Sequence, residues 1–317
     1  MLIQTILGSI TVGSMAGIYN ILKNSKDAED KEIIVENITK YEYIPLEDNE
    51  NIMFKSFSFK DKIIYQYTEG EKDGLKVCIG LDANGNNVWL DMLNTHLLIG
   101  GMARKGKSSL IRSILVGLML TYTPNEVKFV LCDFKNSDVK LFERYKHVYG
   151  GCSHDKVSFL KQMKWLNEEC ERRALYLAEK DELNMIDYNK NKTIEGKFPY
   201  IVVVIDELPQ VMADIECQTA LHLTMSKVPY TGIYFILATQ DCSKNTIGRC
   251  KMNCSQTIGF GTRDKTDGDL LMPGAGLENI KKAGICKIDD LEEIKEFQSF
   301  YTEVEDVKKL LKHNLKN

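Results

Sequence analysis

The stretch NTHLLIGGMARKGKSS at residues 94–109 decides the fold that the sequence predicts. An apolar run at 96–99 precedes the pattern G-x-x-x-x-G-K-S at 101–108, and an apolar stretch with helical spacing follows at 110–120. A strand before this pattern and a helix after it are the context of a phosphate-binding loop. Its glycines allow tight turns close to a phosphate, and its amides and the helix N-terminus attract the anion. The stretch therefore predicts a nucleoside triphosphate site.

The residues of this loop have separate expected roles. Lys107 is expected to reach the β and γ phosphates, and the Ser108 hydroxyl is expected to ligate Mg²⁺. The phosphates are expected to contact Gly101, Met102, Ala103, Arg104, Lys105, Gly106, Lys107, Ser108 and Ser109. A glycine-rich turn that matches the pattern by chance is the alternative, and the flanking strand and helix argue against it.

A second stretch, PYIVVVIDE at 199–207, predicts a buried strand that ends in two acids. Its consecutive apolar, mostly β-branched residues are typical of such a strand, and ligands bind at the carboxyl ends of strands in open α/β sheets. Asp206 is expected to hold Mg²⁺ through its water shell, and Glu207 to orient and deprotonate the attacking water. Many strands end in a solvated acid, so the assignment depends on pairing with the phosphate loop upstream.

Further apolar runs complete an α/β fold with a mostly parallel central sheet. They predict strands at 127–132 and 233–238 and a long amphipathic helix at 156–182. Thr239 and Gln240 follow the second of these strands, and this polar pair is expected to sense the γ phosphate, with Gln240 acting in catalysis; a polar strand end that caps the next turn is the alternative. Arg172 and Arg173 are expected on the solvated face of the long helix, and 304–315 is expected to form a short helix.

The N-terminal part predicts a membrane anchor. Residues 2–22 carry no charge, Lys23 and Lys26 follow, and Gly13 and Gly17 have the spacing of paired membrane helices. A surface-lying amphipathic helix and a signal-like peptide remain alternatives. The predicted organisation is an anchor at 1–23, a linker at 24–50, and a nucleotide-binding domain at 51–317 whose first part, 51–90, is small and β-rich. The domain would then be cytoplasmic and tethered to the cell membrane.

Charge and cysteine content limit the other functions. The net charge is −4 and the pI is about 5.9, which weakens a static DNA-coating role but permits a ring that touches DNA with a few loops. The nine cysteines contain no C-x-x-C pair. A zinc site from Cys242, Cys250 and Cys254 remains open, although thiols of a reducing cytoplasm are favoured.

The ordered set of motifs resembles the motor domain of the FtsK/SpoIIIE DNA translocases, which belong to the RecA-like, HerA-type ring ATPases. The similar stretches are IGLDANGNNVWLDMLNTHLLIGGMARKGKSS, VLCDFKNSDVKLFERY, WLNEECERRALYLAEKDELNMIDYN, PYIVVVIDEL, GIYFILATQ and TIGRCKMN. Together they cover residues 75–300, and an ordered set of this kind is far more specific than a phosphate loop alone.

The resemblance implies a RecA-like P-loop NTPase fold and a hexameric ring that moves duplex DNA through its channel by hydrolysing ATP with Mg²⁺. Such motors serve chromosome segregation, conjugation or mobile-element transfer, so division or conjugation machinery would be partners. Asp133 and Lys135 would lie near the nucleotide or the subunit interface. The DNA-contacting loop would fall at 261–270, with Lys265 as the matching basic residue and Arg263 beside it. Residues 243–265 carry further lysines and arginines that could contact phosphates from loops. Composition alone favours an ordinary solvated loop, and only the resemblance favours DNA contact.

Several positions depart from the family pattern. Asp241 and Cys242 follow Gln240, where the family usually has Arg-Pro, and Thr257 and Asp269 replace basic residues. These changes suggest a divergent, short member, as in a plasmid, transposon or phage. The arginine that a neighbouring subunit supplies in such rings has as candidates Arg104, Arg172, Arg173, Arg249 and Arg263.

Two other classes of function remain possible at this stage. One is a membrane-docked secretion or coupling ATPase that moves a protein or a nucleoprotein complex. The other is a nucleotide-dependent scaffold with little hydrolysis, and the acids Asp206 and Glu207 argue against it.

Overall fold

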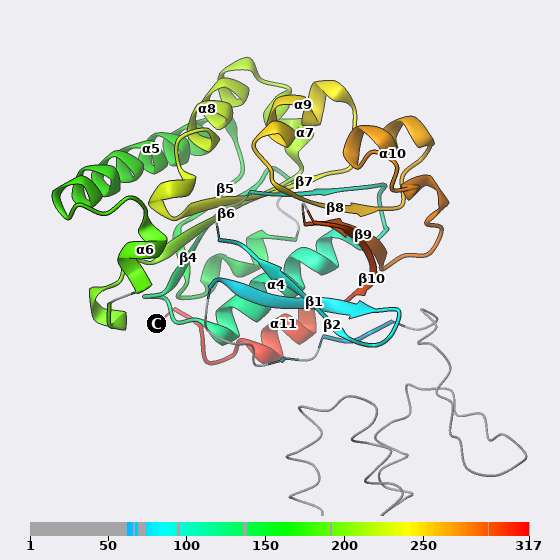
Figure 1. Cartoon of the computed structure of the whole chain (residues 1–317), viewed down its shortest axis with the longest axis horizontal. Coiled ribbons are helices and arrows are strands. Elements are labelled where there is room, and N and C mark those ends of the chain that lie inside the picture. Colours follow the sequence, from blue (N-terminus) through cyan, green and yellow to red (C-terminus); the bar gives the residue numbers. More distant parts are fainter. Residues whose placement is uncertain are drawn as a thin grey trace, which may run out of the picture. The chain divides into compact units, whose positions relative to one another are not determined.

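A ten-stranded sheet forms the centre of the part of the chain that the structure describes (Figure 1). The computed structural model describes residues 62–65, 67–68, 74–93, 96–135, 138–190, 192–290 and 292–316. The strand order is β2-β1-β10-β9-β8-β3-β7-β6-β4-β5. The strands are β1 (Lys76–Asp82), β2 (Asn87–Asp91), β3 (Leu97–Gly100), β4 (Val127–Asp133), β5 (Val148–Ser153), β6 (Tyr200–Asp206), β7 (Ile233–Thr239), β8 (Gln256–Phe260), β9 (Ile285–Asp289) and β10 (Ile294–Ser299).

The half of the sheet from β8 to β5 is parallel throughout. Every residue of β3 and β7 is buried, and so are the five apolar residues at the centre of β6. Parallel strands are covered by helices on both faces, which is why their sequences read as continuous apolar runs rather than as alternating ones. The predicted strands at 96–99, 127–132, 199–207 and 233–238 and the mostly parallel sheet are confirmed.

The other half, from β8 to β2, is antiparallel. The predicted β-rich part appears here as the hairpin of β1 and β2, with its turn at 83–86, and β1 joins the sheet through β10. The run at 62–67 forms only an isolated bridge between Ile64 and Tyr301. The predicted run at 54–59, the linker and the anchor lie outside the described residues.

Helices cover both faces of the sheet (Figure 1). They are α4 (Lys107–Thr121), α5 (Lys156–Glu179), α6 (Met185–Lys190), α7 (Leu208–Met212), α8 (Ile215–Met225), α9 (Lys244–Met252), α10 (Lys265–Leu271) and α11 (Val304–Leu310), with short 3₁₀ helices at Lys140–Arg144, Ile194–Gly196, Pro229–Thr231 and Leu277–Asn279. α5, α7, α8 and α9 lie on one face, and α4 and α11 lie on the other. Side chains alternate along each strand, so Val203 and Ile205 belong to the core beneath α5 and α8.

One expectation about a chain segment is wrong, and another is confirmed except for where the helix ends. Residues 243–265 are not a loop: α9 and β8 occupy most of the segment, and α9 buries Thr246, Ile247 and Cys250 on one face. The helix expected at 304–315 ends as α11 at Leu310. In the part of the chain that the structure describes, no helix has the length and apolarity to cross a membrane.

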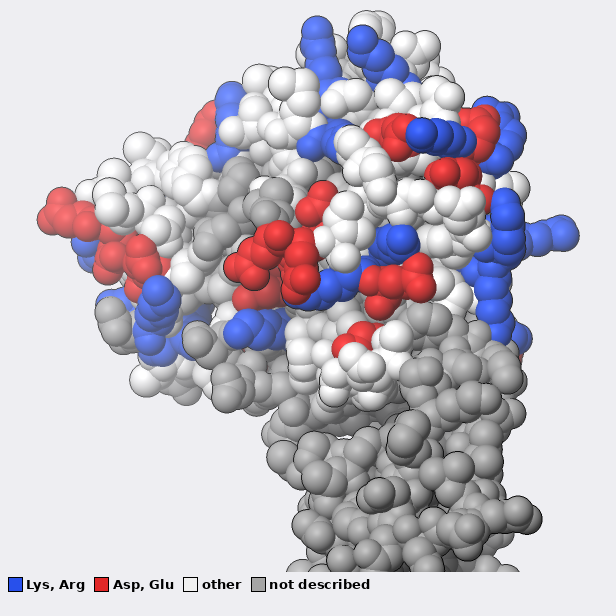
Figure 2. Space-filling model, turned by 45° about the vertical axis from the view of Figure 1, so that its right-hand side comes forward, with Lys and Arg blue, Asp and Glu red and all other residues white. Residues whose placement is uncertain are grey.

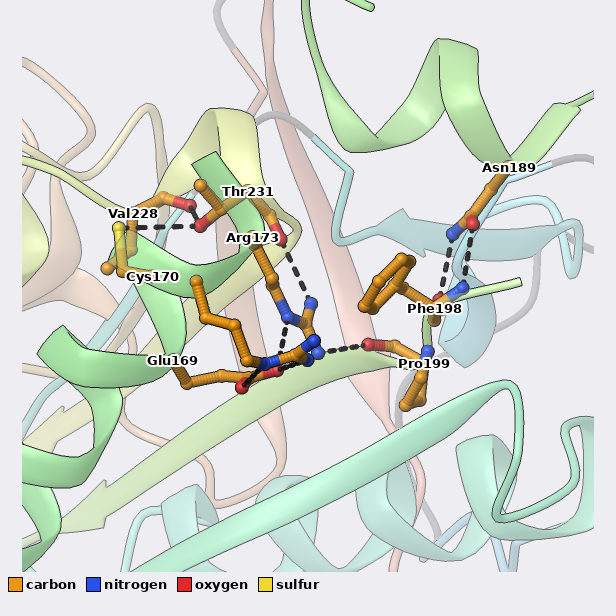
Figure 3. A network of polar contacts seen from close by, with 9 residues as sticks. Glu169, Cys170, Arg173, Asn189, Phe198, Pro199, Val228 and Thr231 are labelled. Carbon is orange, nitrogen blue, oxygen red and sulfur yellow. Dashed lines mark hydrogen bonds and ion pairs between the residues drawn. The ribbon is translucent and has the colours of Figure 1, made fainter. Parts of the chain in front are cut away.

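Arg173 connects α5 by hydrogen bonds to the starts of two central strands, β6 and β7 (Figure 3). Its guanidinium donates to Glu169 Oε1 at 2.7 Å, to the Thr231 carbonyl at 2.9 Å and to the Pro199 carbonyl at 2.9 Å. The side chain is 1% exposed, so its expected place on the solvated face is wrong. The neighbouring Arg172 is 56% exposed and pairs with the same glutamate, as expected. Of the two adjacent arginines, only Arg173 therefore connects α5 to the central strands.

We expect Arg173→Met to lower the free energy of unfolding by about 3 kcal/mol, because it leaves two backbone carbonyls without their donor and the partly buried carboxylate of Glu169 with Arg172 alone. Arg172→Met is the matched control, and it should cost less than about 1 kcal/mol because exposed ion pairs contribute little. Urea unfolding of both variants measures the difference. Equal, small losses would contradict a structural role for the buried guanidinium.

Candidate active site

The register of four parallel strands brings their carboxyl ends to one edge of the sheet. Gly100 at the end of β3 pairs with Thr239 of β7. Asp206 at the end of β6 pairs with Ala238 of β7 on one side and with Asp133 of β4 on the other. The residues that follow these strand ends therefore meet, although more than a hundred positions separate Gly100 from Thr239 in the sequence.

A cleft of about 310 Å³ lies at this edge. Its lining residues are Ala103, Arg104, Gly106, Lys107, Ser108, Ser109, Arg112, Lys135, Asp138, Asp206, Glu207, Ala238, Thr239, Gln240 and Tyr301. The two acids predicted at the end of β6 thus share one cleft with the predicted phosphate loop and with Gln240. Gly101, Met102 and Lys105 belong to the loop but are not among the lining residues.

The phosphate loop is held by the β8 side of the sheet. The Met102 amide donates to the Gly261 carbonyl at 3.0 Å, and the Gly284 amide donates to the Lys105 carbonyl at 2.8 Å. Gly101 and Gly106 have φ values of 138° and 123°, which disfavour any other residue. A Cβ at Gly101 would lie 2.7 Å from Phe260 Cβ, so this glycine permits packing against β8 in addition to the turn.

The end of the cleft at α4 has the features of an anion site. Lys107 is buried, which lowers the pKa of its ammonium to about 8, and its Nζ donates to the Gly101 and Met102 carbonyls at 2.6 and 2.7 Å. The first turn of α4 has no acidic residue, and no side chain caps its N-terminus. An uncapped helix N-terminus beside a lysine fits a phosphate group.

The β6 end of the cleft is acidic. Burial, together with the nearby carboxylates of Asp133, Asp138 and Glu207, raises the pKa of Asp206 to about 7. A divalent cation would relieve this repulsion, because opposite charge favours the ionised carboxylate. Asp133 is fully buried, and its oxygens accept from the amides of Lys135, Val139 and Lys140. Asp133 therefore shapes the connection after β4 and does not line the cleft.

Glu207 is held from two sides. Its Oε2 accepts from Lys135 Nζ and, at 2.9 Å, from Gln240 Nε2. Its backbone is left-handed, with φ at 84°, which is uncommon for a residue with a Cβ and often marks a functional position. Lys135, expected near the nucleotide from the family resemblance alone, thus contacts the predicted general base directly.

The two polar residues at the end of β7, Thr239 and Gln240, have different roles. The Thr239 hydroxyl donates to the Asp241 carbonyl at 2.7 Å and accepts from the Asp241 amide at 3.0 Å, so it caps the turn. Gln240 points to Glu207 instead. The turn-capping alternative therefore applies to Thr239, whereas the geometry of Gln240 fits the catalytic side of the cleft.

The sequence interpretation missed Arg112, which lines the cleft from α4. Its Nε donates to the Thr302 carbonyl at 2.8 Å, and its NH1 forms an ion pair with Asp138. A sequence signal existed, because Arg112 lies four residues after Ser108 and therefore on the same helix face. Its partners could not be predicted, since Thr302 is almost two hundred residues away.

The candidate trans arginines and DNA-contact residues lie in different environments. Arg173 is withdrawn as a trans arginine, because it is fully buried in its own subunit. Arg104 lines the cleft and is exposed. Arg249 and Arg172 are exposed as well, away from the cleft lining. The expected DNA loop at 261–270 contains the start of α10 instead, with Lys265 exposed at its first position.

Arg263 is 75% exposed and forms ion pairs with Asp264 and Asp267. Its charge is therefore partly balanced. The cysteines in the described residues are free thiols, and no three His, Cys, Asp or Glu side chains there are arranged to hold a metal ion. The zinc alternative receives no support from Cys242, Cys250 and Cys254, of which the first two are buried.

Comparison with known sequences places the chain in a family. A profile of the FtsK/SpoIIIE family matches residues 60–244. The chain is 28% identical over 253 residues to the DNA translocase FtsK of Leptospira interrogans, covering 76% of the chain and 27% of the relative. It is 31% identical over 220 residues to the DNA translocase SftA of Bacillus subtilis, covering 67% and 23%. The chain thus spans about a quarter of the length of these relatives.

Solved structures share the fold. The pCW3 conjugation coupling protein TcpA, in a monomer form with ATPγS, superposes with a TM-score of 0.71 at 20% identity, over 90% of this chain and 86% of that one. The cytoplasmic domain of the Type VII Secretion ATPase EccC of Thermomonospora curvata gives 0.68 at 21% identity, over 78% and 32%. At these identities the similarity establishes the fold alone.

Proposed function

The chain belongs to the FtsK/SpoIIIE family, and we propose that it is an ATP-driven motor that moves duplex DNA. The observation that carries the proposal is the meeting of Lys107, Asp206 and Glu207 in one cleft, which joins an anion site to a cation site. The relatives named above are DNA translocases, which supports DNA as the substrate.

The cleft residues divide the work of hydrolysis. Lys107 and the loop amides would bind the phosphates, and Ser108 and Asp206 would hold Mg²⁺, which when bound neutralises charge that develops on the phosphates. Glu207 would accept a proton from the attacking water. Lys135 and Gln240 donate to Glu207 and so fix the direction of its carboxylate.

Two variants separate binding from chemistry. Lys107→Ala should weaken ATP binding roughly 10- to 100-fold, because it removes charge-assisted hydrogen bonds to phosphate. Glu207→Gln should retain ATP binding and lower turnover about 100-fold or more, because the amide cannot accept the proton. Equilibrium binding of a fluorescent ATP analogue and steady-state phosphate release measure the two effects. Rapid turnover in Glu207→Gln would refute the role given to this residue.

We propose that the motor contacts DNA through a few cations in a homo-oligomeric ring, which we propose to be a hexamer. On the face drawn in Figure 2, lysines and arginines are interspersed with aspartates and glutamates among the described residues. Such a surface does not attract DNA over its whole area, so the contact would depend on particular side chains. Lys265, exposed at the start of α10, is the proposed contact, with Arg263 secondary because of its ion pairs.

Duplex DNA should stimulate the ATPase activity of the full chain, and Lys265→Ala should reduce this stimulation while basal hydrolysis persists. The variant should also lower the slope of log affinity against log salt by about one, as expected for one lost phosphate contact. Lys164→Ala on α5, whose side chain is 79% exposed, is the matched control. An unchanged response to DNA in Lys265→Ala would remove this residue from the interface.

A second candidate is a coupling or secretion ATPase that moves a protein or nucleoprotein complex. Two proteins with a similar structure are a conjugation coupling protein and a secretion ATPase, and this supports the second candidate. The DNA-stimulation measurement separates the two functions, because a protein-moving ATPase would respond to its protein partner and not to bare duplex. Conjugation or division machinery would be the setting of either function.

We also propose that residues 2–22 anchor the chain in the cell membrane with the motor on the cytoplasmic side. The uncharged stretch and the lysines after it support this. Full-length chain should stay in the membrane pellet after alkaline extraction, whereas a variant with Ile10→Lys and Ser14→Lys should not, since charges at the bilayer centre are costly. Release of the unmodified chain would favour a surface-lying helix.

A further inference from the structure

We infer that Tyr301 forms the wall of a nucleobase subsite and stacks against the base of the bound nucleotide. The inference rests on the proposed function, because it concerns the same cleft. It deepens that function by assigning the recognition of the nucleoside to a residue two positions after the end of β10, far in sequence from the phosphate loop.

Tyr301 lies where the cleft meets α4, because the next residue, Thr302, is hydrogen-bonded to that helix. The Thr302 amide donates to Ser109 Oγ at 2.7 Å, its carbonyl accepts from Arg112 Nε at 2.8 Å, and its hydroxyl lies 2.6 Å from Ser113 Oγ. Thr302 is fully buried. Three contacts to the first two turns of α4 thus fix the position of Tyr301 relative to the phosphate loop.

The segment at 62–65 supports Tyr301 from the other side. The Tyr301 amide donates to the Ile63 carbonyl at 2.6 Å, and the Tyr65 amide donates to the Tyr301 carbonyl at 3.2 Å. Lys62 Nζ lies 3.9 Å from the centroid of the Tyr301 ring, over one of its faces. Tyr301 is also one of the residues that line the cleft, and Lys62 leaves the other face and the edge of its ring open to a ligand.

The contacts of Ser109 connect the phosphate loop to the chain beside Tyr301. Lys107, Glu207 and Gln240 lie around the end assigned to the terminal phosphate. Ser109 follows the loop, and its side chain contacts the backbone on both sides of Tyr301. A base that extends from the phosphates past Ser109 would reach this ring.

The chemistry of the cleft lining points to the same role. Among the described residues that line the cleft, Tyr301 is the one aromatic side chain, and most of the others are charged or polar. Aromatic side chains stack on nucleobases, and removal of one such partner costs about tenfold or more in affinity. A fixed aromatic ring in a charged cleft is therefore suited to the flat, apolar part of the ligand.

Binding of ATPγS and of inorganic tripolyphosphate to the full chain, each with Mg²⁺, tests this inference by calorimetry. Tripolyphosphate has the phosphates but no base. Tyr301→Ala should weaken ATPγS about tenfold and change tripolyphosphate less than about twofold. Tyr301→Phe should keep both affinities, and Tyr301→Leu, which preserves apolar bulk for folding, should behave as the alanine variant does. Tyr230→Ala, an exposed tyrosine in the 3₁₀ helix after α8, is the control that should change neither affinity.

The outcomes separate this inference from the proposed function. If Tyr301→Ala weakens both ligands equally, Tyr301 supports the loop and not the base, and the inference is overturned. The same follows if neither affinity changes, or if unmodified protein binds the two ligands equally well. If unmodified protein binds neither ligand, the proposed ATPase function fails with it.

Discussion

The whole site depends on the parallel register of β3, β7, β6 and β4, which brings four strand ends to one edge of the sheet. Shifting one strand by a single residue would turn each of its side chains to the opposite face. The buried strands prevent this, because every residue of β7 is packed against a helix or a neighbouring strand. Stability of the sheet and geometry of the cleft therefore have the same origin: the apolar side chains that fix the register also aim Asp206 at the phosphate loop.

The parts of the site that the sequence predicted are those in which one local segment contains both the scaffold and the functional group. Lys107 follows its strand and glycine turn directly, and Asp206 ends an apolar run. Strand β10 of the antiparallel half gave a weaker pattern, because only its last three residues are buried. The contact of Lys135 with Glu207 could not be predicted from residues alone, because it joins the ends of two strands that only the sheet brings together.

Helical periodicity was insufficient to predict which of two adjacent arginines of α5 is buried. Arg172 and Arg173 belong to the same charged run, and a period of 3.6 residues leaves the boundary between a buried and an exposed face uncertain by one residue. Burial of Arg173 requires acceptors, and these come from the Thr231 and Pro199 carbonyls just before β7 and β6. The burial of the Arg173 guanidinium therefore depends on distant backbone atoms and not on the periodicity of the helix that carries it.

The departure from the family pattern after Gln240 has a structural explanation. Asp241 Oδ1 accepts from the Ser243 amide at 2.9 Å, and its Oδ2 accepts from the hydroxyls of Ser243 and Thr246. The acid thus anchors the first turn of α9, at the end of a helix where negative charge is favourable. Gln240 keeps its contact with Glu207 on the other side of the same turn. Asp241 therefore attaches α9 in this chain while Lys135 and Gln240 both contact Glu207, so an acid at this position is compatible with the arrangement of the cleft.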